Sequence, residues 1–255
     1  MAVFVCGLDE TAGRNQRDNF FMGGFVAPET DWSLTFAPEW EERVLAGPPS
    51  IPYLHMTDMR SPKWREEYGL SKTEADSRID AAIDLIDKTR GLSPIGVDVD
   101  GGEVCDLFSE MRVVHPKGGN VRFDPDYLCF ISYSYLALSH IAKSYADAEK
   151  VDFIIERNGR ITKYIQAFHF GFATSLAAIG RSDLSRLVGE LIPAGKDRIP
   201  LQAADVLCWH TARSKDFMDE ADLRRYAKIA SKIGMRATLD GTHLKELAIL
   251  LTTAP

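Results

Sequence analysis

The chain has 255 residues, of which 45% are hydrophobic and 26% are charged, as in an ordinary globular protein with a large core. Its formal net charge of −7 argues against a surface that binds nucleic acid along its whole length, but it allows a local basic groove. No apolar run is long enough to span a bilayer and no basic leader precedes the first apolar segment. The four cysteines form no C-x-x-C pair, which favours buried thiols in a reducing compartment. We therefore expect a cytoplasmic protein with no membrane partner.

The first apolar run, from Val3 to Leu8, predicts a buried strand that two carboxylates, Asp9 and Glu10, follow directly. An unpaired buried carboxylate is costly, so a charge at the tip of such a strand is solvated, paired or bound to a cation. Asn19 to Ala27 predicts a second strand, and the polar turn between the two favours a hairpin.

The next stretch, about 29–92, is predicted to be a helical insertion before the third strand. Its clearest element is a helix from Ser71 to Thr89, which opens with an S-x-x-E capping box and continues with apolar residues at helical spacing. The segment from Tyr53 to Asp58 predicts a loop or a short extended piece. Within it, His55 is a candidate ligand or acid/base group, and a local hydrogen-bonded turn with Asp58 is the alternative.

Further elements follow at regular intervals along the chain. The apolar patterns predict a strand at Pro94 to Val99, a helix at Pro125 to Ala146, a strand at Val151 to Glu156, a helix at Ile161 to Ala178 and a strand at Leu187 to Ile192. Glu156 ends its strand as Asp9 ends the first. Asp98 and Asp100, beside a glycine pair, are either turn residues or part of a site.

The segment from Pro200 to Trp209 predicts a helix of small and apolar residues with a single carboxylate, Asp205, in its middle. Gln202 lies on the same helical face, because it precedes Asp205 by three residues. A helix this apolar should be buried on most sides, so packing explains Asp205 least. This carboxylate either caps a loop or pairs with an arginine, or it converges with Asp9 and Glu156 around a metal.

The order of these elements is that of the ribonuclease H-like fold, in which three strands form an antiparallel meander and the fourth lies parallel to the first. We therefore predict an α/β, ribonuclease H-like fold with a mixed five-stranded sheet flanked by helices and a helical insertion between strands two and three. Residues 1–255 form a single domain with a C-terminal helical extension at about 216–255. In this arrangement Asp9, Glu156 and Asp205 meet at one edge of the sheet.

Short motifs add a family resemblance. D-E-T-A-G from Asp9 to Gly13 resembles the D-E-S-G signature of the family catalogued as domain of unknown function 3800, and L-Q-A-A-D from Leu201 to Asp205 is similar to another of its blocks. The resemblance runs from Val3 to about Trp209 and implies a ribonuclease H-like fold with metal-dependent nuclease activity. Thr11 stands where serine is common. The helix from Pro125 to Ala146 lacks the glutamate of ribonuclease H enzymes, which leaves three carboxylates, as in integrase-like members.

Three converging carboxylates suit Mg²⁺ or Mn²⁺, because these ions prefer oxygen ligands and assist phosphoryl chemistry. We predict that Asp9, Glu156 and Asp205 are metal ligands of a phosphodiesterase that acts on nucleic acid. Glu10 is a further candidate, although adjacent strand residues point to opposite faces. The side chains predicted to orient phosphate or water are those of His55, Lys196 and Gln202.

A basic stripe is predicted on a helix from Glu220 to Met235, where Arg224, Lys228 and Lys232 recur every four residues. It either contacts a phosphate backbone or is simply a solvated helix face. The alternative function is a catalytically inactive ribonuclease H-like module that binds nucleic acid or a protein. Arginines paired with Asp9 or Asp205 would favour this alternative.

Overall fold

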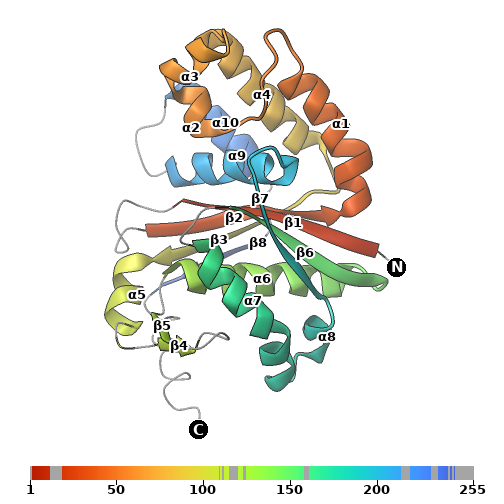
Figure 1. The fold of residues 1–255 in the computed structure, drawn as a ribbon, viewed down its shortest axis with the longest axis vertical. Helices are drawn as coiled ribbons and strands as arrows, with labels where there is room; N and C mark the ends of the chain where they lie inside the picture. Colours follow the sequence, from red (N-terminus) through yellow and green to blue (C-terminus); the bar gives the residue numbers. More distant parts are fainter. Residues whose placement is uncertain are drawn as a thin grey trace.

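The computed structural model describes residues 2–11, 19–108, 110, 112–114, 120–122, 125–157, 161–213, 219–230, 235–240, 242 and 244. Within these residues, helices cover both faces of a six-stranded sheet with the order β7-β6-β1-β2-β3-β8 (Figure 1). The strands of this sheet are β1 (Ala2–Thr11), β2 (Asn19–Pro28), β3 (Ser93–Asp100), β6 (Ala148–Glu156), β7 (Val188–Ala194) and β8 (Met235–Leu239). A separate ribbon pairs β4 (Arg112–Val114) with β5 (Asn120–Arg122).

The sheet is mixed, as predicted. Strands β1, β2 and β3 form an antiparallel meander, β6 lies parallel to β1, and β7 lies parallel to β6. The predicted number of five strands is wrong, because β8 pairs in parallel with β3 at the edge. Exposed and half-buried residues alternate along β8, which is the two-residue period of a strand.

The predicted C-terminal helical extension is therefore wrong where β8 lies. The described helix α10 spans Glu220–Ala230, and Met235 begins the strand. Basic residues recur every four residues as far as Arg236, and this spacing predicts one long helix. The spacing cannot show where the helix ends, because it continues unchanged into the strand. The Arg236 guanidinium instead donates a hydrogen bond to each carboxylate oxygen of Asp98, at 2.6 and 2.9 Å. Asp98 thus has a structural role, and so does Asp100, which accepts a hydrogen bond from the first turn of the next helix.

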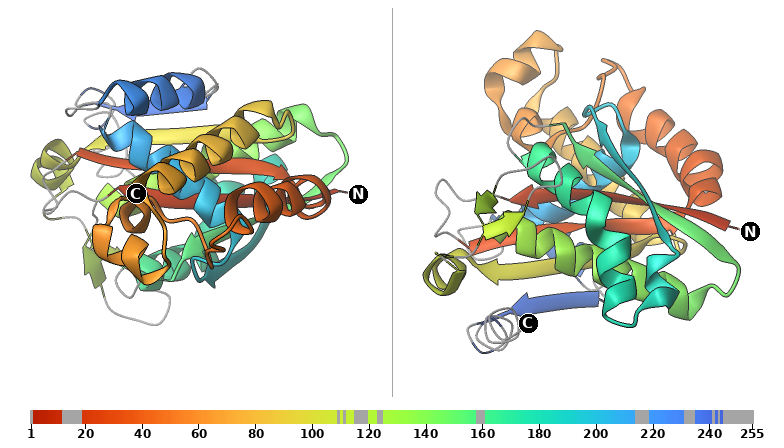
Figure 2. Two further views of the ribbon diagram at one scale, coloured as in Figure 1. Left: turned by 90° about the horizontal axis from the view of Figure 1, so that it is seen from above. Right: turned by 60° about the horizontal axis from the view of Figure 1, so that its bottom comes forward.

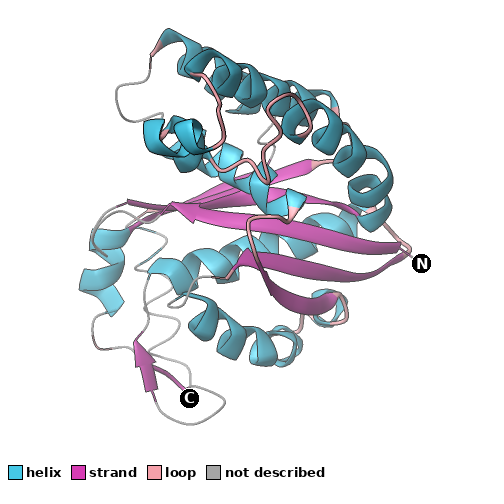
Figure 3. Ribbon diagram, turned by 45° about the horizontal axis from the view of Figure 1, so that its top comes forward, coloured by secondary structure: helices cyan, strands magenta, loops and turns pink. Residues whose placement is uncertain are grey.

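One face of the sheet packs against α5 (Gly101–Phe108), α6 (Pro125–Ser144), α7 (Ile161–Ala178) and α8 (Ser182–Ser185) (Figure 3). On the other face α9 (Ile199–Arg213) crosses β1 and β2 (Figure 2). Alternation along β1 explains the two cores: Phe4, Cys6 and Leu8 face α6, and Val5 faces α9. The strands and helices predicted between Pro94 and Ile192 are present within a few residues of their expected ends.

The chain between β2 and β3 is helical, with π-helical turns η1 (Asp31–Phe36) and η2 (Glu41–Leu45) around α1 (Ala37–Trp40), followed by α2 (Met56–Arg60), α3 (Pro62–Glu67) and α4 (Lys72–Lys88). The prediction of a loop or extended piece up to Asp58 is wrong from Met56 onward, where α2 begins. Buried Arg78 of α4 holds the end of η2 and the loop after it by donating to the backbone carbonyls of Val44, Leu45, Gly47 and Pro49. No helix in the described parts of the chain has the length and apolar character needed to cross a membrane.

The capping box at the start of α4 is confirmed. Ser71 Oγ accepts a hydrogen bond from the Glu74 amide at 3.2 Å, and Glu74 Oε2 accepts one from the Ser71 amide at 2.8 Å. We expect Ser71→Ala to lower the free energy of unfolding by about 1 kcal/mol, because a helix N-terminal amide loses its acceptor. Urea denaturation measures this change. Ser71→Asp keeps an acceptor and should retain most of the stability, so an equal loss in both variants would contradict the capping role.

Candidate carboxylate site

Two of the predicted ligands lie side by side on the sheet. Leu8 of β1 pairs with Ile155 of β6, and Asp9 and Glu156 are each one residue further along these parallel strands. Because side chains alternate, Asp9 shares the α9 side with Val5, and Glu156 shares it with Ile154. The predicted convergence of strands one and four therefore occurs on the face that α9 covers.

The third predicted ligand reaches the same place from α9, because a glycine lets this helix approach the sheet. A Cβ atom added at Gly7 would lie 2.5 Å from the Cβ and the carbonyl oxygen of Pro200, so only glycine fits this contact. One turn beyond Asp205, the Cys208 thiol donates to the Asp9 carbonyl at 3.2 Å. Asp205 thereby faces the ends of β1 and β6.

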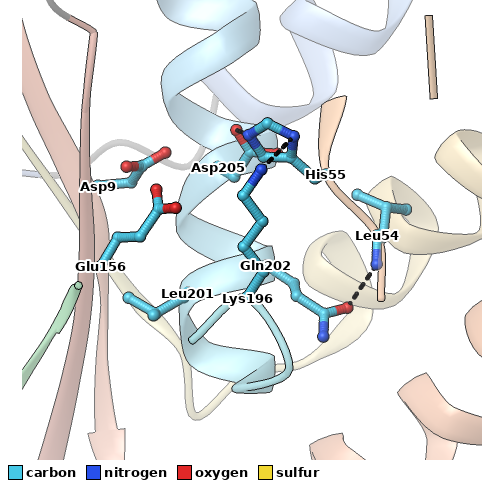
Figure 4. A pocket seen from close by; sticks show the side chains of 8 residues that line it. All are labelled: Asp9, Leu54, His55, Glu156, Lys196, Leu201, Gln202 and Asp205. Carbon is cyan, nitrogen blue, oxygen red and sulfur yellow. Dashed lines mark hydrogen bonds and ion pairs between the residues drawn. The ribbon is translucent and has the colours of Figure 1, made fainter. Parts of the chain in front are cut away.

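These carboxylates line one pocket of about 260 Å³, a volume that includes space open to solvent. Figure 4 shows Asp9 and Glu156 pointing into it from the strands, and Asp205 from the helix. The remaining walls are formed by Leu54, His55, Lys196, Leu201 and Gln202. The pocket thus combines residues of the sheet, α9, the helical insertion and the loop between β7 and α9.

Two of these carboxylates, Asp9 and Asp205, are held in a setting that disfavours their charged form. Removal from water raises the pKa of Asp9 well above its ordinary value, and the charges of Asp205 and Glu156 raise it further. Removal from water also raises the pKa of Asp205 to about 7, although the Met56 amide and Lys196 favour its charged form. Burial therefore favours the protonated forms of Asp9 and Asp205, and a bound cation would favour their charged forms instead.

The donor chemistry fits a hard divalent cation, because the three converging acids supply only oxygen atoms and a cation would relieve their repulsion. Neither Asp9 nor Asp205 forms an ion pair with an arginine that the structure describes. Among the described residues, however, no group of three His, Cys, Asp or Glu side chains is arranged to hold a metal ion as it stands.

His55 lines the pocket and also contacts Asp58. The local contact with Asp58 and the place beside the carboxylates therefore occur together. Its Nδ1 lies 3.0 Å from Asp58 Oδ2 and 3.1 Å from Lys196 Nζ. Its Nε2 lies 3.9 Å from Asp205 Oδ1. Burial lowers the pKa of His55, and the positive charge of Lys196 lowers it further, which favours a neutral imidazole.

Gln202 connects three segments around the pocket. Its Oε1 accepts hydrogen bonds from Trp40 Nε1 at 2.8 Å and from the Leu54 amide at 2.9 Å, and its Nε2 donates to the Asp197 carbonyl at 3.3 Å. Three residues later, Asp205 Oδ2 accepts from the Met56 amide at 2.6 Å. Two side chains of α9 thus hold the extended segment that presents His55.

The amides of Leu54 and Met56 are functional groups that sequence reasoning missed. No residue type marks them, because every residue except proline carries a backbone amide. Only the pairing of the helical insertion with α9 shows their role. Leu54 and Leu201, which form hydrophobic walls of the pocket, were also missed. Apolar residues are common throughout the core, so their residue type does not mark a pocket.

The other predicted site residues are not brought to the pocket. Glu10 follows Asp9 on β1 and is not among the lining residues, in keeping with strand alternation. Arg224 pairs with Glu220 and Lys228 pairs with Asp84, each at 2.7 Å, beside a hollow between α10 and α4. Acidic residues of α4 and α10 therefore offset the positive charge of Arg224 and Lys228 in the basic stripe. Lys232 lies outside the described residues.

The chain matches no model of a known family, and comparisons with curated proteins and with solved structures found no match either. The resemblance to the domain of unknown function 3800 family stays a prediction. Function is therefore argued from the pocket.

Proposed function

We propose that this protein is a divalent-metal-dependent phosphodiesterase that acts on nucleic acid and is built on a ribonuclease H-like fold. The observation that carries the proposal is the convergence of Asp9, Glu156 and Asp205 in one pocket, with no described arginine paired to Asp9 or Asp205. An arginine paired with either of these two carboxylates would favour a structural role for the cluster. The antiparallel meander with β6 parallel to β1 supports the assignment of the fold.

The residues that would hold Mg²⁺ or Mn²⁺ are Asp9, Glu156 and Asp205. When bound, such a cation lowers the pKa of a water molecule and offsets the charge of phosphate oxygens. Lys196 Nζ supplies a positive charge at the pocket wall and can donate to a phosphate oxygen. The neutral ring of His55 can accept a proton at the nitrogen that does not hold one, while Asp58 orients the ring.

The second candidate function is a catalytically inactive module of the same fold that binds nucleic acid or a protein. Two observations favour it: Lys196 already offsets part of the carboxylate charge, and the described acids are not arranged to hold an ion as they stand. The two functions therefore differ in whether the carboxylates bind a cation.

Calorimetric titration with Mn²⁺ tests the proposal. We expect the native protein to bind Mn²⁺ and the double variant Asp9→Asn/Asp205→Asn to lose this binding, because two ligands become neutral amides. The matched control is Glu39→Gln/Glu42→Gln, which removes two exposed charges from the helical insertion. This control should bind Mn²⁺ as the native protein does.

A native protein that binds no Mn²⁺ at millimolar concentration would contradict the proposal and leave the inactive module. Equal losses in both double variants would point to weak, non-specific attraction by net charge. If binding is specific, Mn²⁺-dependent cleavage of an oligonucleotide should follow, and Asp205→Asn should abolish it.

A further inference from the structure

Three aromatic side chains form a row that begins at the rim of the carboxylate pocket. The ring centroids of Tyr53 and Trp64 are 6.1 Å apart, and those of Trp64 and Tyr68 are 4.5 Å apart. Lys196 Nζ lies 5.8 Å from the Tyr53 centroid and also lines the pocket. We call Tyr53, Trp64 and Tyr68 the aromatic row.

The row follows from local structure. Tyr53 lies directly before the segment that α9 holds through the Leu54 amide. Trp64 and Tyr68 are four residues apart around the end of α3, a spacing that places them on one helix face. Ser61 precedes this helix as its N-cap, and its side chain accepts a hydrogen bond from the Trp64 amide. The rings therefore have fixed positions relative to the pocket.

Partial exposure separates the row from the aromatic core. Trp32, Trp40 and Trp209 are buried, and the first two donate their indole N–H groups to Val5 and Gln202. All three rings of the row are partly exposed. Packing of the helical insertion accounts for their buried sides but leaves aromatic surface open to solvent beside a lysine and a carboxylate cluster.

We propose that the aromatic row binds unpaired bases of single-stranded nucleic acid next to the phosphate group that enters the carboxylate pocket. This inference rests on the proposed function, because the pocket supplies the reason for a phosphate there. Aromatic side chains stack on bases of any identity, and only unpaired bases offer free faces. Lys196, between the row and the pocket, is placed to contact the connecting phosphate.

The chemistry of the row also sets the expected salt dependence. Stacking does not release counterions, and Lys196 is the cation that joins the row to the pocket. On α3, Lys63 and Arg65 flank Trp64, and the exposed Glu66 and Glu67 offset these two charges, so the helix has little net attraction for phosphate. The affinity for a single strand should therefore fall only weakly with salt, with a logarithmic slope of about −1, since few phosphates are neutralised.

Intrinsic fluorescence provides a direct test, because Trp64 is the partly exposed tryptophan among the four of this chain. The protein is titrated in EDTA, to prevent cleavage, with a twelve-nucleotide oligothymidylate, with a duplex of the same length and with thymidine monophosphate. We expect the single strand to quench Trp64 emission and the other two to bind at least tenfold more weakly.

Anisotropy of a labelled oligothymidylate then compares variants. Trp64→Leu/Tyr68→Leu should weaken binding about tenfold or more, and Trp64→Phe, which keeps a ring, should bind within a few-fold of the native protein. Near-native affinity in the double leucine variant, or equal binding of the duplex or the mononucleotide, would overturn the inference. Thermal melting of both variants shows that any loss is not due to unfolding.

The same double leucine variant separates this inference from the proposed function. Its carboxylates are unchanged, so its Mn²⁺ titration should match that of the native protein. Mn²⁺ binding together with ring-independent oligonucleotide binding would refute the aromatic row and leave the phosphodiesterase proposal standing. Ring-dependent binding by a protein that does not bind Mn²⁺ would support the row and refute the phosphodiesterase.

Discussion

Asp205→Asn is expected to stabilise the metal-free protein at pH 8 by on the order of 2 kcal/mol, although it removes a proposed metal ligand. Asparagine keeps an oxygen that can accept from the Met56 amide at the place where Asp205 Oδ2 accepts it, at 2.6 Å. It carries no charge, so it avoids both the burial of a carboxylate and the repulsion from Asp9 and Glu156. Buried carboxylates that bind a cation are expected to lower the free energy of unfolding when the cation is absent, because nothing then offsets their repulsion.

The pH dependence follows from the raised pKa of Asp205. Folding raises this pKa from 3.8 to about 7, so between these values the folded protein holds a proton that the unfolded chain has released. The stability contributed by the protonated carboxyl is fully present below pH 4 and is lost as the pH rises to about 7. The advantage of Asp205→Asn should therefore be small near pH 4 and full at pH 8.

Urea denaturation in EDTA at these two pH values measures the effect. Asp98→Asn is the matched control, because the same substitution there removes a carboxylate that Arg236 neutralises with two hydrogen bonds. That variant should lose stability at pH 8. If Asp205→Asn is also destabilising at pH 8, the Asp205 carboxylate is compensated within the fold, and the charge argument for a metal is wrong.

Gln202→Leu is expected to lower the free energy of unfolding by about 3 kcal/mol, because it leaves several buried groups without partners. The substitution removes the acceptor of Trp40 Nε1 and of the Leu54 amide, together with the donor to the Asp197 carbonyl. Each unsatisfied buried polar group costs about 1–3 kcal/mol, and the apolar side chain recovers part of this cost. The segment that presents His55 should loosen as well.

Hydrogen exchange at the Leu54 amide distinguishes this local effect from general destabilisation. We expect Gln202→Leu to increase its exchange strongly. Trp40→Phe, which removes one of the donors to Gln202 but leaves the Leu54 bond, should leave this amide protected. Unchanged protection of Leu54 in Gln202→Leu would show that the segment is held by other contacts.

Local patterns were sufficient for the elements that carry the carboxylates. Apolar runs ending in Asp9 and Glu156 indicated two strands, and the small-residue helix identified Asp205 as a charge that packing does not explain. Alternation along β1 separated Asp9 from Glu10. These properties depend on neighbours within a few residues, where the periods of strands and helices are regular.

Tertiary structure decided the rest of the pocket. The contact of His55 with Lys196, and the acceptors that α9 offers to the Leu54 and Met56 amides, exist because the helical insertion lies against α9 and the loop before it. Long-range pairing also placed β8 on the sheet and turned Lys228 of α10 toward an acidic residue of α4. Sequence by itself therefore identified the three carboxylates that enter the site, because burial patterns are local, but it did not exclude the basic residues of α10. Only the folded chain decided what surrounds them, because those partners are distant in sequence and are not marked by residue type.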